Sequence, residues 1–485
     1  MPVVAAHVAL LCSLATVAHV LSLVVVSPAT IRSRPAPRAP DAAKQEWRSH
    51  GSGTTSLVEV VSIRAWRRYR GVVSSYLPRL VDPLIDELLA DFAALLIVGP
   101  RASGKTTTAA RHVRSVARLD RPAEAAAFRA DPDVALAGLP EPVLIDEWQV
   151  VPEVLGAVKR AVDTDPRRGR FLVTGSVRAD LRHEGWPATG RLVRVDMTGL
   201  TQREFARRDL DRIPWLDKLG EHGVSALEVV PDPPNLRGYV DLAIAGGFPE
   251  PTLQVPTRGR ARWLTSYLDR VLSRDVAELG ETRDRGRLRR FFEAYALNTA
   301  GEVSDRSLFE AAGIDRKTAD AYERLLHDLL LVDTLPAWSD NRLKRLVRSS
   351  KRYVCDPGLV AAILQTNGDG VLRDGNLLGR MIDTFVLAQL RAELALSDRP
   401  PRLYHLRREG GDREIDLVAE FGGRHVVAVE IKAHSAPTPH AARHLVWLRE
   451  QLGDRFLAGV VLHTGPRIYR LDDRVVAAPI ASIWS

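Results

Sequence analysis

Cysteine is nearly absent from this chain, with two residues, Cys12 and Cys355, among 485. Two thiols can build neither a disulfide framework nor a cysteine-based zinc site, which favours a reducing compartment, the cytoplasm. Aromatic residues contribute 6% and charged residues 26%, whereas 45% of the chain is hydrophobic. This balance is typical of soluble globular proteins and excludes a disordered chain, a collagen-like repeat and a polytopic membrane protein. The length allows about three domains of roughly 150 residues.

Lysine is scarce as well: it supplies 8 of the 68 basic residues, which leaves 68 − 8 = 60 arginines. Against 60 acidic residues, the formal net charge is +8. A bias toward arginine is typical of GC-rich genomes and need not reflect function. The charge is therefore compatible with a polyanionic partner but does not identify one.

The N-terminus lacks a basic start. Residues 3–26 are almost entirely apolar and no Lys or Arg precedes them, which argues against a cleaved signal peptide. The segment is long enough to cross a membrane as a helix, and the arginines after it would then place the rest of the chain in the cytoplasm. We favour the alternative, a mis-assigned start in which residues 1–56, including a Pro-, Ala- and Ser-rich linker, form no part of the folded protein. A membrane is a partner only if residues 3–26 are genuine.

A phosphate-binding loop is recognisable from its sequence and its surroundings. Residues 99–106 read Gly-Pro-Arg-Ala-Ser-Gly-Lys-Thr and fill every fixed position of the pattern G-x-x-x-x-G-K-[ST]. A helix is expected at residues 80–90 and a strand at residues 93–98 before the loop, and a helix at residues 107–116 after it. The order strand, loop, helix is the context that this pattern requires, so the sequence predicts a nucleotide site of the P-loop type.

The residues of the loop have separate expected roles. Gly99 and Gly104 allow backbone N–H groups to turn toward phosphate oxygens, and the N-terminus of the next helix adds a partial positive charge. Lys105 is expected to reach the β- and γ-phosphates of ATP, and Thr106 is expected to hold Mg²⁺.

A pair of acidic residues forms the second half of the expected site. The apolar run at residues 142–146 ends in Asp146 and is followed by Glu147. We expect Asp146 to bind Mg²⁺ through water and Glu147 to orient or deprotonate the attacking water. A buried strand that ends in two acids is common, so the spacing of 146 − 105 = 41 residues from Lys105 carries the inference.

A further strand, residues 171–176, has polar residues near its end. Thr174 and Ser176 either sense the γ-phosphate or cap a turn. Arg191 after Gly190 either neutralises phosphate charge or, as one of 60 arginines, is a solvated residue. We include Thr174 and Arg191 in the expected nucleotide site.

These motifs recur with others in a fixed order. The ordered set comprises Asp146 to Gln149, Pro152, Asp163, Thr174 to Ser176, Gly190, Arg191, Leu200 to Glu204, Gly246 to Glu250, Tyr267 to Arg270, Arg274 and Asp275. Over about residues 75–485 the chain resembles the prokaryotic family of AAA-type ATP-binding proteins with a C-terminal domain of unknown function. The resemblance implies ATP binding and hydrolysis, with ATP and Mg²⁺ as cofactors. It also implies a homo-oligomer, since AAA-type enzymes often act as rings.

The middle of the chain has helical spacing. Residues 255–300 are expected to lie in a helical lid over the nucleotide. Two helices joined at a glycine, residues 304–313 and 317–331, suggest a helix-turn-helix, and residues 331–338 and 351–355 would add the strands of a wing. Such a winged helix either contacts nucleic acid or serves only for packing. The basic residues expected to face a phosphate backbone are Arg316, Lys317, Arg324, Arg342, Lys344, Arg345, Arg348, Lys351 and Arg352.

The last part of the chain alternates helix and strand. A helix is expected at residues 379–395, and strands are expected at residues 402–406, 414–420 and 425–433. The last two strands carry Asp416, Glu430 and Lys432, which form a D…E-x-K pattern.

This pattern resembles the PD-(D/E)xK, restriction-endonuclease-like fold. The resemblance implies that Asp416 and Glu430 hold a metal ion and that Lys432 positions water or stabilises developing phosphate charge. Asp383 on the preceding helix stands where relatives usually have a glutamate, so it is a further metal candidate with a shorter side chain.

Strand geometry predicts how these residues meet. Glu430 and Lys432 lie two residues apart and share one face. A three-residue loop at residues 422–424 keeps the apolar residues of both strands on one face and brings the acids together. The alternative is the polar face of an ordinary hairpin. The expected cross-strand pairs are Asp416 with Glu430, Leu417 with Val429, and Ile415 with Ile431.

The expected fold is α/β, with a P-loop AAA-type parallel sheet, a helical lid, a winged-helix middle region and a restriction-endonuclease-like C-terminal domain. The expected function is Mg²⁺-dependent ATP hydrolysis coupled to an action on nucleic acid. The alternative is an ATP-gated regulatory or interaction protein with an inactive nuclease-like domain. The expected boundaries are 1–56 for the apolar segment and linker, 57–235 for the ATPase domain, 236–300 for the lid, 301–355 for the winged-helix-like region and 356–485 for the nuclease-like domain.

Overall fold

The computed structural model describes residues 76–176, 190–207, 213–275, 284–341, 345, 349–408 and 412–485. All of them belong to one compact unit, residues 60–485. The apolar segment at residues 3–26 and the linker after it lie outside the described residues, so their interpretation stays a prediction. Within the described ranges, no helix is both long enough and apolar enough to span a membrane.

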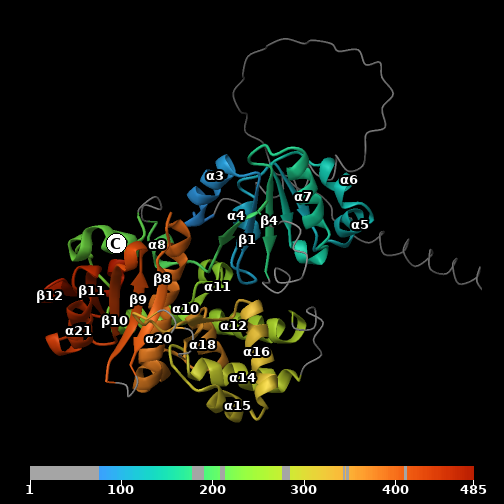
Figure 1. The fold of residues 1–485 in the computed structure, drawn as a ribbon. Helices are drawn as coiled ribbons and strands as arrows, with labels where there is room; N and C mark the ends of the chain where they lie inside the picture. Colours follow the sequence, from blue (N-terminus) through green and yellow to red (C-terminus); the bar gives the residue numbers. More distant parts are fainter. Residues whose placement is uncertain are drawn as a thin grey trace, which may run out of the picture. The chain divides into compact units, whose positions relative to one another are not determined.

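A five-stranded parallel sheet forms the first part of the described chain (Figure 1). Its strands are Ala94–Val98 (β1), Ser115–Arg118 (β2), Val143–Asp146 (β3), Phe171–Gly175 (β4) and Val193–Asp196 (β5). The strand order is β2-β3-β4-β1-β5, so β4 lies between β3 and β1. Strands β1, β3 and β4 are buried along their whole length, as is typical of parallel strands covered on both faces. Because parallel strands end at the same edge, the residues that follow β1, β3 and β4 are neighbours.

Helices cover both faces of this sheet. On one face, α5 (Pro122–Ala130), α6 (Pro132–Ala137) and α7 (Val154–Thr164) pack in a common apolar cluster with β1, β3 and β4. On the other face, α3 (Val81–Asp91) and α4 (Lys105–Ala109) pack against the alternate strand residues. Figure 1 shows α3 and α7 on opposite sides of β4.

The helix after the P-loop is much shorter than expected. Helix α4 ends at Ala109, and Val116, which the prediction placed at the end of a helix, pairs with Leu144 in the sheet. The prediction of a helix over residues 107–116 is therefore wrong at its C-terminal half. Residues 115–116, at the end of that window, begin the edge strand β2, which is half-buried, and helical spacing did not distinguish a helix from this strand.

Helices dominate the middle of the chain, as the spacing predicted. The elements are α8 (Gln202–Phe205), α9 (Trp215–His222), α10 (Leu236–Ala245), α11 (Pro249–Leu253), α12 (Thr257–Arg270), a π-helical turn (Val271–Asp275), α14 (Arg285–Leu297), α15 (Asp305–Ala312), α16 (Arg316–Asp328), β6 (Val332–Leu335) and β7 (Lys351–Val354). Helices α15 and α16 are joined at Gly313, whose φ of 65° is left-handed and favours glycine. Strands β6 and β7 are antiparallel. The expected helices and strand pair are present, whereas a winged-helix role stays a prediction.

A six-stranded mixed sheet forms the C-terminal part. The elements are α18 (Pro357–Ile363), α19 (Gly368–Arg373), α20 (Gly375–Glu393), β8 (Arg402–Arg407), β9 (Glu414–Glu420), β10 (Val426–Lys432), α21 (Arg443–Leu452), β11 (Phe456–His463), β12 (Tyr469–Asp472) and β13 (Val475–Pro479). The strand order is β12-β13-β11-β10-β9-β8. Apolar residues of α20 pack in the cluster of one sheet face, and those of α21 pack in the cluster of the other.

The predicted register of β9 and β10 holds over most of their length. A turn over Gly422–Arg424 joins them, and Leu417 pairs with Val429, as predicted. The ladder stops there, at a point where β9 is irregular between Ile415 and Val418 and the carboxylate of Asp416 accepts a hydrogen bond from the N–H of Ile431 at 2.9 Å. Ile415 packs in the apolar cluster opposite to that of Leu417. The predicted ladder pairs of Asp416 with Glu430 and Ile415 with Ile431 are therefore absent from the described register.

One apolar core joins the helical middle to the C-terminal sheet. Its buried residues extend from Trp215 to Ile483 and include Tyr239 and Phe385. The ring of Trp484 contacts both of these, with centroid distances of 6.3 Å to Tyr239 and 6.1 Å to Phe385. The core thus passes through the predicted boundaries at residues 236, 301 and 356.

Candidate functional site

Three polar side chains meet where β1, β3 and β4 end. The hydroxyl of Thr106 donates a hydrogen bond to Oδ1 of Asp146 at 2.7 Å, and the hydroxyl of Thr174 donates to the same oxygen at 2.6 Å. The strand order explains this meeting, because β4 lies between the other two strands. Hydroxyl and carboxylate oxygens are the ligands that Mg²⁺ prefers, so Thr106 and Asp146 fit a magnesium site.

Lys105 points back into its own loop. Its ammonium donates hydrogen bonds to the carbonyl oxygens of Gly99 and Pro100, both at 2.9 Å, and the side chain is buried. Burial lowers the pKa of Lys105 to about 8, while the charges of Glu147 and Asp146 oppose that shift. To bind a phosphate, the ammonium must exchange these carbonyl acceptors for phosphate oxygens.

The loop backbone depends on its two glycines. Gly104 has a φ of 96°, in the left-handed region that side chains disfavour. A Cβ at Gly99 would lie 2.0 Å from the carbonyl oxygen of Met197. Because α4 has only five residues, the helix dipole expected behind the loop is short. The backbone N–H groups of the loop are therefore the main donors available to phosphate oxygens.

Glu147 is held by two neighbours. The hydroxyl of Ser176 lies 3.2 and 3.3 Å from its two carboxylate oxygens, and the side-chain amide of Gln149 donates to Oε2. The φ of Glu147 is 57°, a conformation that costs energy in residues with a Cβ and is common at functional sites. Among the described residues, Thr174 binds Asp146 and Ser176 binds Glu147, the two acidic residues at the end of β3.

Arg191 lies away from this group. Its Nε is 2.5 Å from Oδ1 of Asp163 on α7, and both residues are exposed. Arg191 precedes β5, whereas the P-loop follows β1, and the two strands are parallel. Arg191 and the P-loop therefore lie at opposite ends of the strands, about 15 Å apart at roughly 3.3 Å per residue. Arg191 thus does not lie beside the P-loop of this chain, and its contact with a nucleotide stays a prediction.

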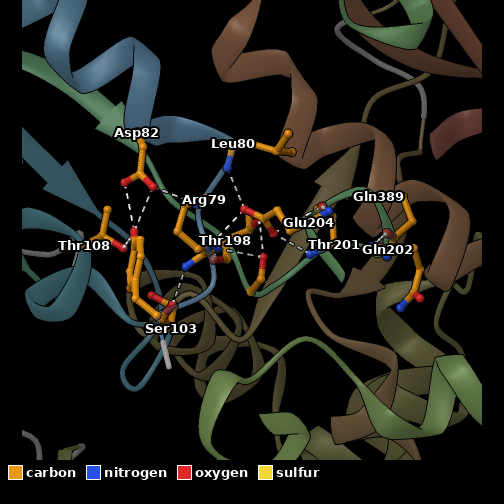
Figure 2. Close-up of polar contacts among 12 residues, drawn as sticks. Arg79, Leu80, Asp82, Ser103, Thr108, Thr198, Thr201, Gln202, Glu204 and Gln389 are labelled. Carbon is orange, nitrogen blue, oxygen red and sulfur yellow. Dashed lines mark hydrogen bonds and ion pairs between the residues drawn. The ribbon is translucent and has the colours of Figure 1, made fainter. Parts of the chain in front are cut away.

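A buried ion pair that the motifs did not reveal holds the P-loop (Figure 2). Nε of Arg79 lies 2.8 Å from Oε1 of Glu204. Two other nitrogens of the same guanidinium donate to the carbonyl oxygens of Ser103 and Thr198, both at 2.9 Å. Arg79 is one of 60 arginines, so composition hid it. The available signal was the pattern T-x-x-E at Thr201, which the structure forms as a capping box.

Tyr76 adds a contact from the same segment. Its hydroxyl donates to the carboxylate of Asp82 at 2.8 Å and lies 3.2 Å from the hydroxyl of Thr108 on α4. The guanidinium carbon of Arg111 lies 4.2 Å from the centre of the tyrosine ring. Residues before α3 therefore brace both the P-loop and the short helix behind it.

Helix α8 is bound to α20 by polar contacts. The backbone N–H of Gln202 donates to Oε1 of Gln389 at 2.8 Å (Figure 2). Arg203 lies 3.0 Å from Oε1 of Glu393, and both side chains are buried. The same short helix carries Glu204, the partner that fixes the P-loop arginine. Helix α20 is thus connected through α8 to the nucleotide loop.

A second charged group lies at the C-terminal sheet. Asp383 on α20 and Glu430 on β10 are buried. Nζ of Lys432 lies 2.6 Å from Oε1 of Glu430. The hydroxyl of Tyr353 donates to Oδ1 of Asp383 at 3.1 Å. Asp383, Asp416, Glu430 and Lys432 are the residues that the D…E-x-K pattern and the preceding helix predicted to meet.

Lys351 lies among these carboxylates. Its Nζ is 2.9 Å from Oδ1 of Asp416, 3.6 Å from Oε1 of Glu414 and 3.7 Å from Oδ2 of Asp383. Lys351 is 2% exposed. The prediction that Lys351 faces a phosphate backbone is therefore wrong.

Burial and neighbouring charges shift the pKa values of this group. Burial raises the pKa of Asp383 to about 7 and that of Glu430 to about 8, and the charge of Asp416 adds to both shifts. Burial would also raise the pKa of Asp416, but the ammonium groups of Lys351 and Lys432 outweigh it and lower that pKa. The group therefore carries less negative charge near neutral pH than its three acids suggest.

These residues do not fit the divalent-metal site that Asp383, Asp416 and Glu430 were predicted to form. Within the part of the chain that the structure describes, no three His, Cys, Asp or Glu side chains are arranged as metal ligands. The ammonium of Lys351 contacts two of the three carboxylates, and Lys432 is paired with the third.

Other basic residues of the middle region are also paired within the chain. Arg345 lies 2.6 Å from Oε2 of Glu420, and both are buried. Arg352 lies 2.9 Å from Oε1 of Glu323 and also contacts Asp305. Arg345 and Arg352 are therefore not available to a phosphate backbone as predicted. The exposed members of the predicted set are Arg316, Lys317 and Arg324 on α16, and Arg342, Lys344 and Arg348 lie outside the described residues.

Three family models match the chain in succession. An AAA domain matches residues 91–206, a domain of unknown function (DUF8612) matches residues 236–370, and a domain of unknown function (DUF4143) matches residues 378–483. The first match contains the P-loop, Asp146 and Thr174, which establishes the nucleotide-binding half of the structure as a P-loop domain of the AAA type.

Two curated proteins are similar over most of the chain. The uncharacterized proteins Mb2031c of Mycobacterium bovis and Rv2008c of Mycobacterium tuberculosis are each 31% identical over 395 residues, which cover 80% of this chain and 80% of the relative. Among solved structures, the Walker-type ATPase paby2304 of Pyrococcus abyssi aligns with 14% identity and a TM-score of 0.35, over 58% of this chain and 94% of that one. The chain belongs to the family of ATP-binding AAA-domain proteins that carry a C-terminal DUF4143 domain of unknown function.

Proposed function

We propose that this protein hydrolyses ATP with Mg²⁺ at the group formed by Lys105, Thr106, Asp146 and Glu147. The observation that carries the proposal is the convergence on Oδ1 of Asp146 of two hydroxyl groups, one from the P-loop and one from β4. Glu147 follows Asp146 directly in the chain, and the hydroxyl of Ser176 donates to the carboxylate of Glu147. The AAA-domain match supports ATP as the nucleotide.

Each residue has one task in the proposed reaction. Thr106 and Asp146 are the residues that would hold Mg²⁺, and the ion would supply positive charge to the β- and γ-phosphates. Lys105 donates hydrogen bonds to oxygens of both phosphates. Glu147 accepts a proton from water as the water oxygen bonds to the γ-phosphorus and the bond from that phosphorus to the β–γ bridging oxygen breaks. The products are ADP and inorganic phosphate, and Glu147 returns its proton to solvent.

Phosphate release from ATP by the purified full-length protein tests the proposal. Release should require Mg²⁺ and should fall by about 10²-fold or more in Asp146→Asn, as is usual when a contact to developing charge is lost. Asp163→Asn is a matched control, because Asp163 is exposed and forms ion pairs with Lys159 and Arg191 at the surface. Release that continues at full rate in EDTA would show that the proposal is wrong.

For the C-terminal domain we favour an ATP-gated regulatory or interaction role over an action on nucleic acid. Lys351 and Lys432 neutralise the acids that a nuclease would use for metal, and this supports an inactive domain. Exposed basic residues on α16 are what supports nucleic-acid contact. Incubation of single- and double-stranded DNA and RNA with the protein, Mg²⁺ or Mn²⁺ and ATP separates the two. Cleavage that Lys432→Ala abolishes would favour the nuclease and overturn our preference.

Assembly into a homo-oligomer is the remaining proposal about partners. It rests on the AAA-type domain, since proteins of this class often act as rings. Sedimentation of the Glu147→Gln protein with and without ATP tests it, because that variant should bind ATP without consuming it. A single monomeric species under both conditions would contradict it.

A further inference from the structure

The carboxylate cluster of the C-terminal sheet contains its own cation. Lys351 reaches it from β7, in the DUF8612 segment, and lies 2.9 Å from Oδ1 of Asp416 in the DUF4143 segment. Its ammonium is almost completely buried. A buried ammonium requires acceptors of opposite charge, and Asp416, Asp383 and Glu414 supply them.

A second residue of the same strand strengthens this contact. Residues two apart on a strand share one face, so Tyr353 follows Lys351 toward the cluster, and its hydroxyl donates to Asp383 at 3.1 Å. Strand β7 thus supplies the ammonium of Lys351 and the hydroxyl of Tyr353 to Asp416 and Asp383. The strand is itself fixed, because Lys351 pairs with Leu335 of β6 in the antiparallel ladder.

The geometry matches an ammonium and not a divalent metal. The oxygens around Nζ of Lys351 lie at 2.9 to 3.7 Å, whereas Mg²⁺ needs oxygen ligands at about 2.1 Å. A divalent ion beside Nζ would also be repelled by the lysine charge. One buried acceptor remains: Oε2 of Glu430 has no hydrogen-bond partner among the described residues, while its other oxygen pairs with Lys432.

We propose that the ammonium of Lys351 is the resident cation of this cluster and takes the place that the nuclease-like resemblance assigns to a divalent metal ion. The site is a latent metal site: only without Lys351 can the freed carboxylates rearrange around a divalent cation. Lys351 thereby links the middle region to the C-terminal sheet by charge. The proposal concerns this cluster alone and stands whether or not the P-loop site hydrolyses ATP.

Titration of full-length protein with Mn²⁺, with free Mn²⁺ followed by electron paramagnetic resonance, tests the proposal. All proteins carry Asp146→Asn and no nucleotide, so that the P-loop site does not contribute. In the parent, which carries Asp146→Asn alone, adding Asp416→Asn should leave the amount of bound Mn²⁺ unchanged. Lys351→Met should gain about one site per chain, built from oxygen ligands, and Asp416→Asn should remove it again. Lys317→Met, which removes an exposed lysine of α16, should gain none.

Two results would overturn the proposal. One is a Mn²⁺ site in the parent that disappears with Asp416→Asn, since the cluster would then bind metal despite Lys351. The other is a folded Lys351→Met protein, judged by circular dichroism, that gains no Mn²⁺ site. If Lys351→Met does not fold, the comparison of the parent with Asp416→Asn decides alone, and Lys351→Arg should fold and remain without the site, because it keeps the charge.

Discussion

The guanidinium of Arg79 lies 2.8 Å from the carboxylate of Glu204, and both side chains are buried although 125 positions separate them in the chain. The carboxylate also accepts the N–H groups of Leu80 and Thr201. The guanidinium holds the carbonyl oxygen of Ser103 inside the P-loop. The shape of the nucleotide loop therefore depends on residues that belong to neither of its motifs.

Arg79→Ala should lower both stability and ATP affinity. The change leaves the carboxylate of Glu204 buried without its cation, and breaking such a pair typically costs about 3–5 kcal/mol. Urea unfolding measures the free energy of unfolding, and calorimetric titration with MgATP measures affinity. Arg121→Ala serves as the control, since it breaks a half-exposed pair with Glu124 and should change both quantities little. Equal effects of the two substitutions would contradict a special role for Arg79.

Lys105→Ala and Glu147→Gln should separate binding from turnover. Lys105→Ala removes the charge that faces the β- and γ-phosphates, so ATP binding and hydrolysis should both be lost. Glu147→Gln should keep the affinity and slow phosphate release by about 10²-fold or more, because the carboxylate acts on water. Binding of a fluorescent ATP analogue and phosphate release measure the two effects. Our division of roles fails if Glu147→Gln weakens binding as strongly as Lys105→Ala.

ATP affinity should fall as the pH rises above about 8. Burial holds the pKa of Lys105 near 8 in the nucleotide-free protein, and phosphate oxygens bind the protonated form. Below that pKa the ammonium is present and affinity should be flat; above it, the dissociation constant should rise by up to about tenfold per pH unit. Lys105→Arg keeps its charge over this range, so its affinity, at whatever level, should not depend on pH. A wild-type dissociation constant that is constant from about pH 7 to 10 would speak against this account.

Arg203→Met should destabilise the protein more than the double variant Arg203→Met/Glu393→Gln. In the single variant, Glu393 stays buried without the guanidinium that lies 3.0 Å away, and burial already raises its pKa. The double variant removes the charge and keeps an oxygen for the N–H of Trp215. Free energies of unfolding from urea titration should show partial recovery, by about 1–3 kcal/mol. Purely additive losses would mean that the pair is not coupled.

Local patterns predicted the elements that local forces determine. The strands at residues 93–98 and 414–420 were predicted because apolar runs and alternation report burial directly. The pairing of Leu417 with Val429 followed because a buried face selects its register. The length of α4 was not predictable in this way, since Val116 is equally apolar in a helix and in a strand.

The partners of charged residues could not be predicted from spacing. Lys351 lies 65 positions before Asp416, and in sequence it belongs to a basic stretch that suits a phosphate backbone. Only the packing of β7 against the C-terminal sheet turns it inward. The place of Arg191 depends on strand direction. Arg191 precedes β5 and the P-loop follows β1, so the two lie at opposite ends of parallel strands.

The apolar core that runs from Trp215 to Ile483 limits how the gene can be divided. Cloned fragments that begin or end near residues 236, 301 or 356 would each expose one side of the same core, and we expect them to aggregate. A hydrogen bond also joins the two ends of this core: the hydroxyl of Tyr239 accepts the N–H of Ala481, 242 positions away. Chimaeras between relatives should therefore exchange residues 213–485 as one block, and recombination inside that block should succeed only where both parents supply compatible partners for Tyr239 and Phe385.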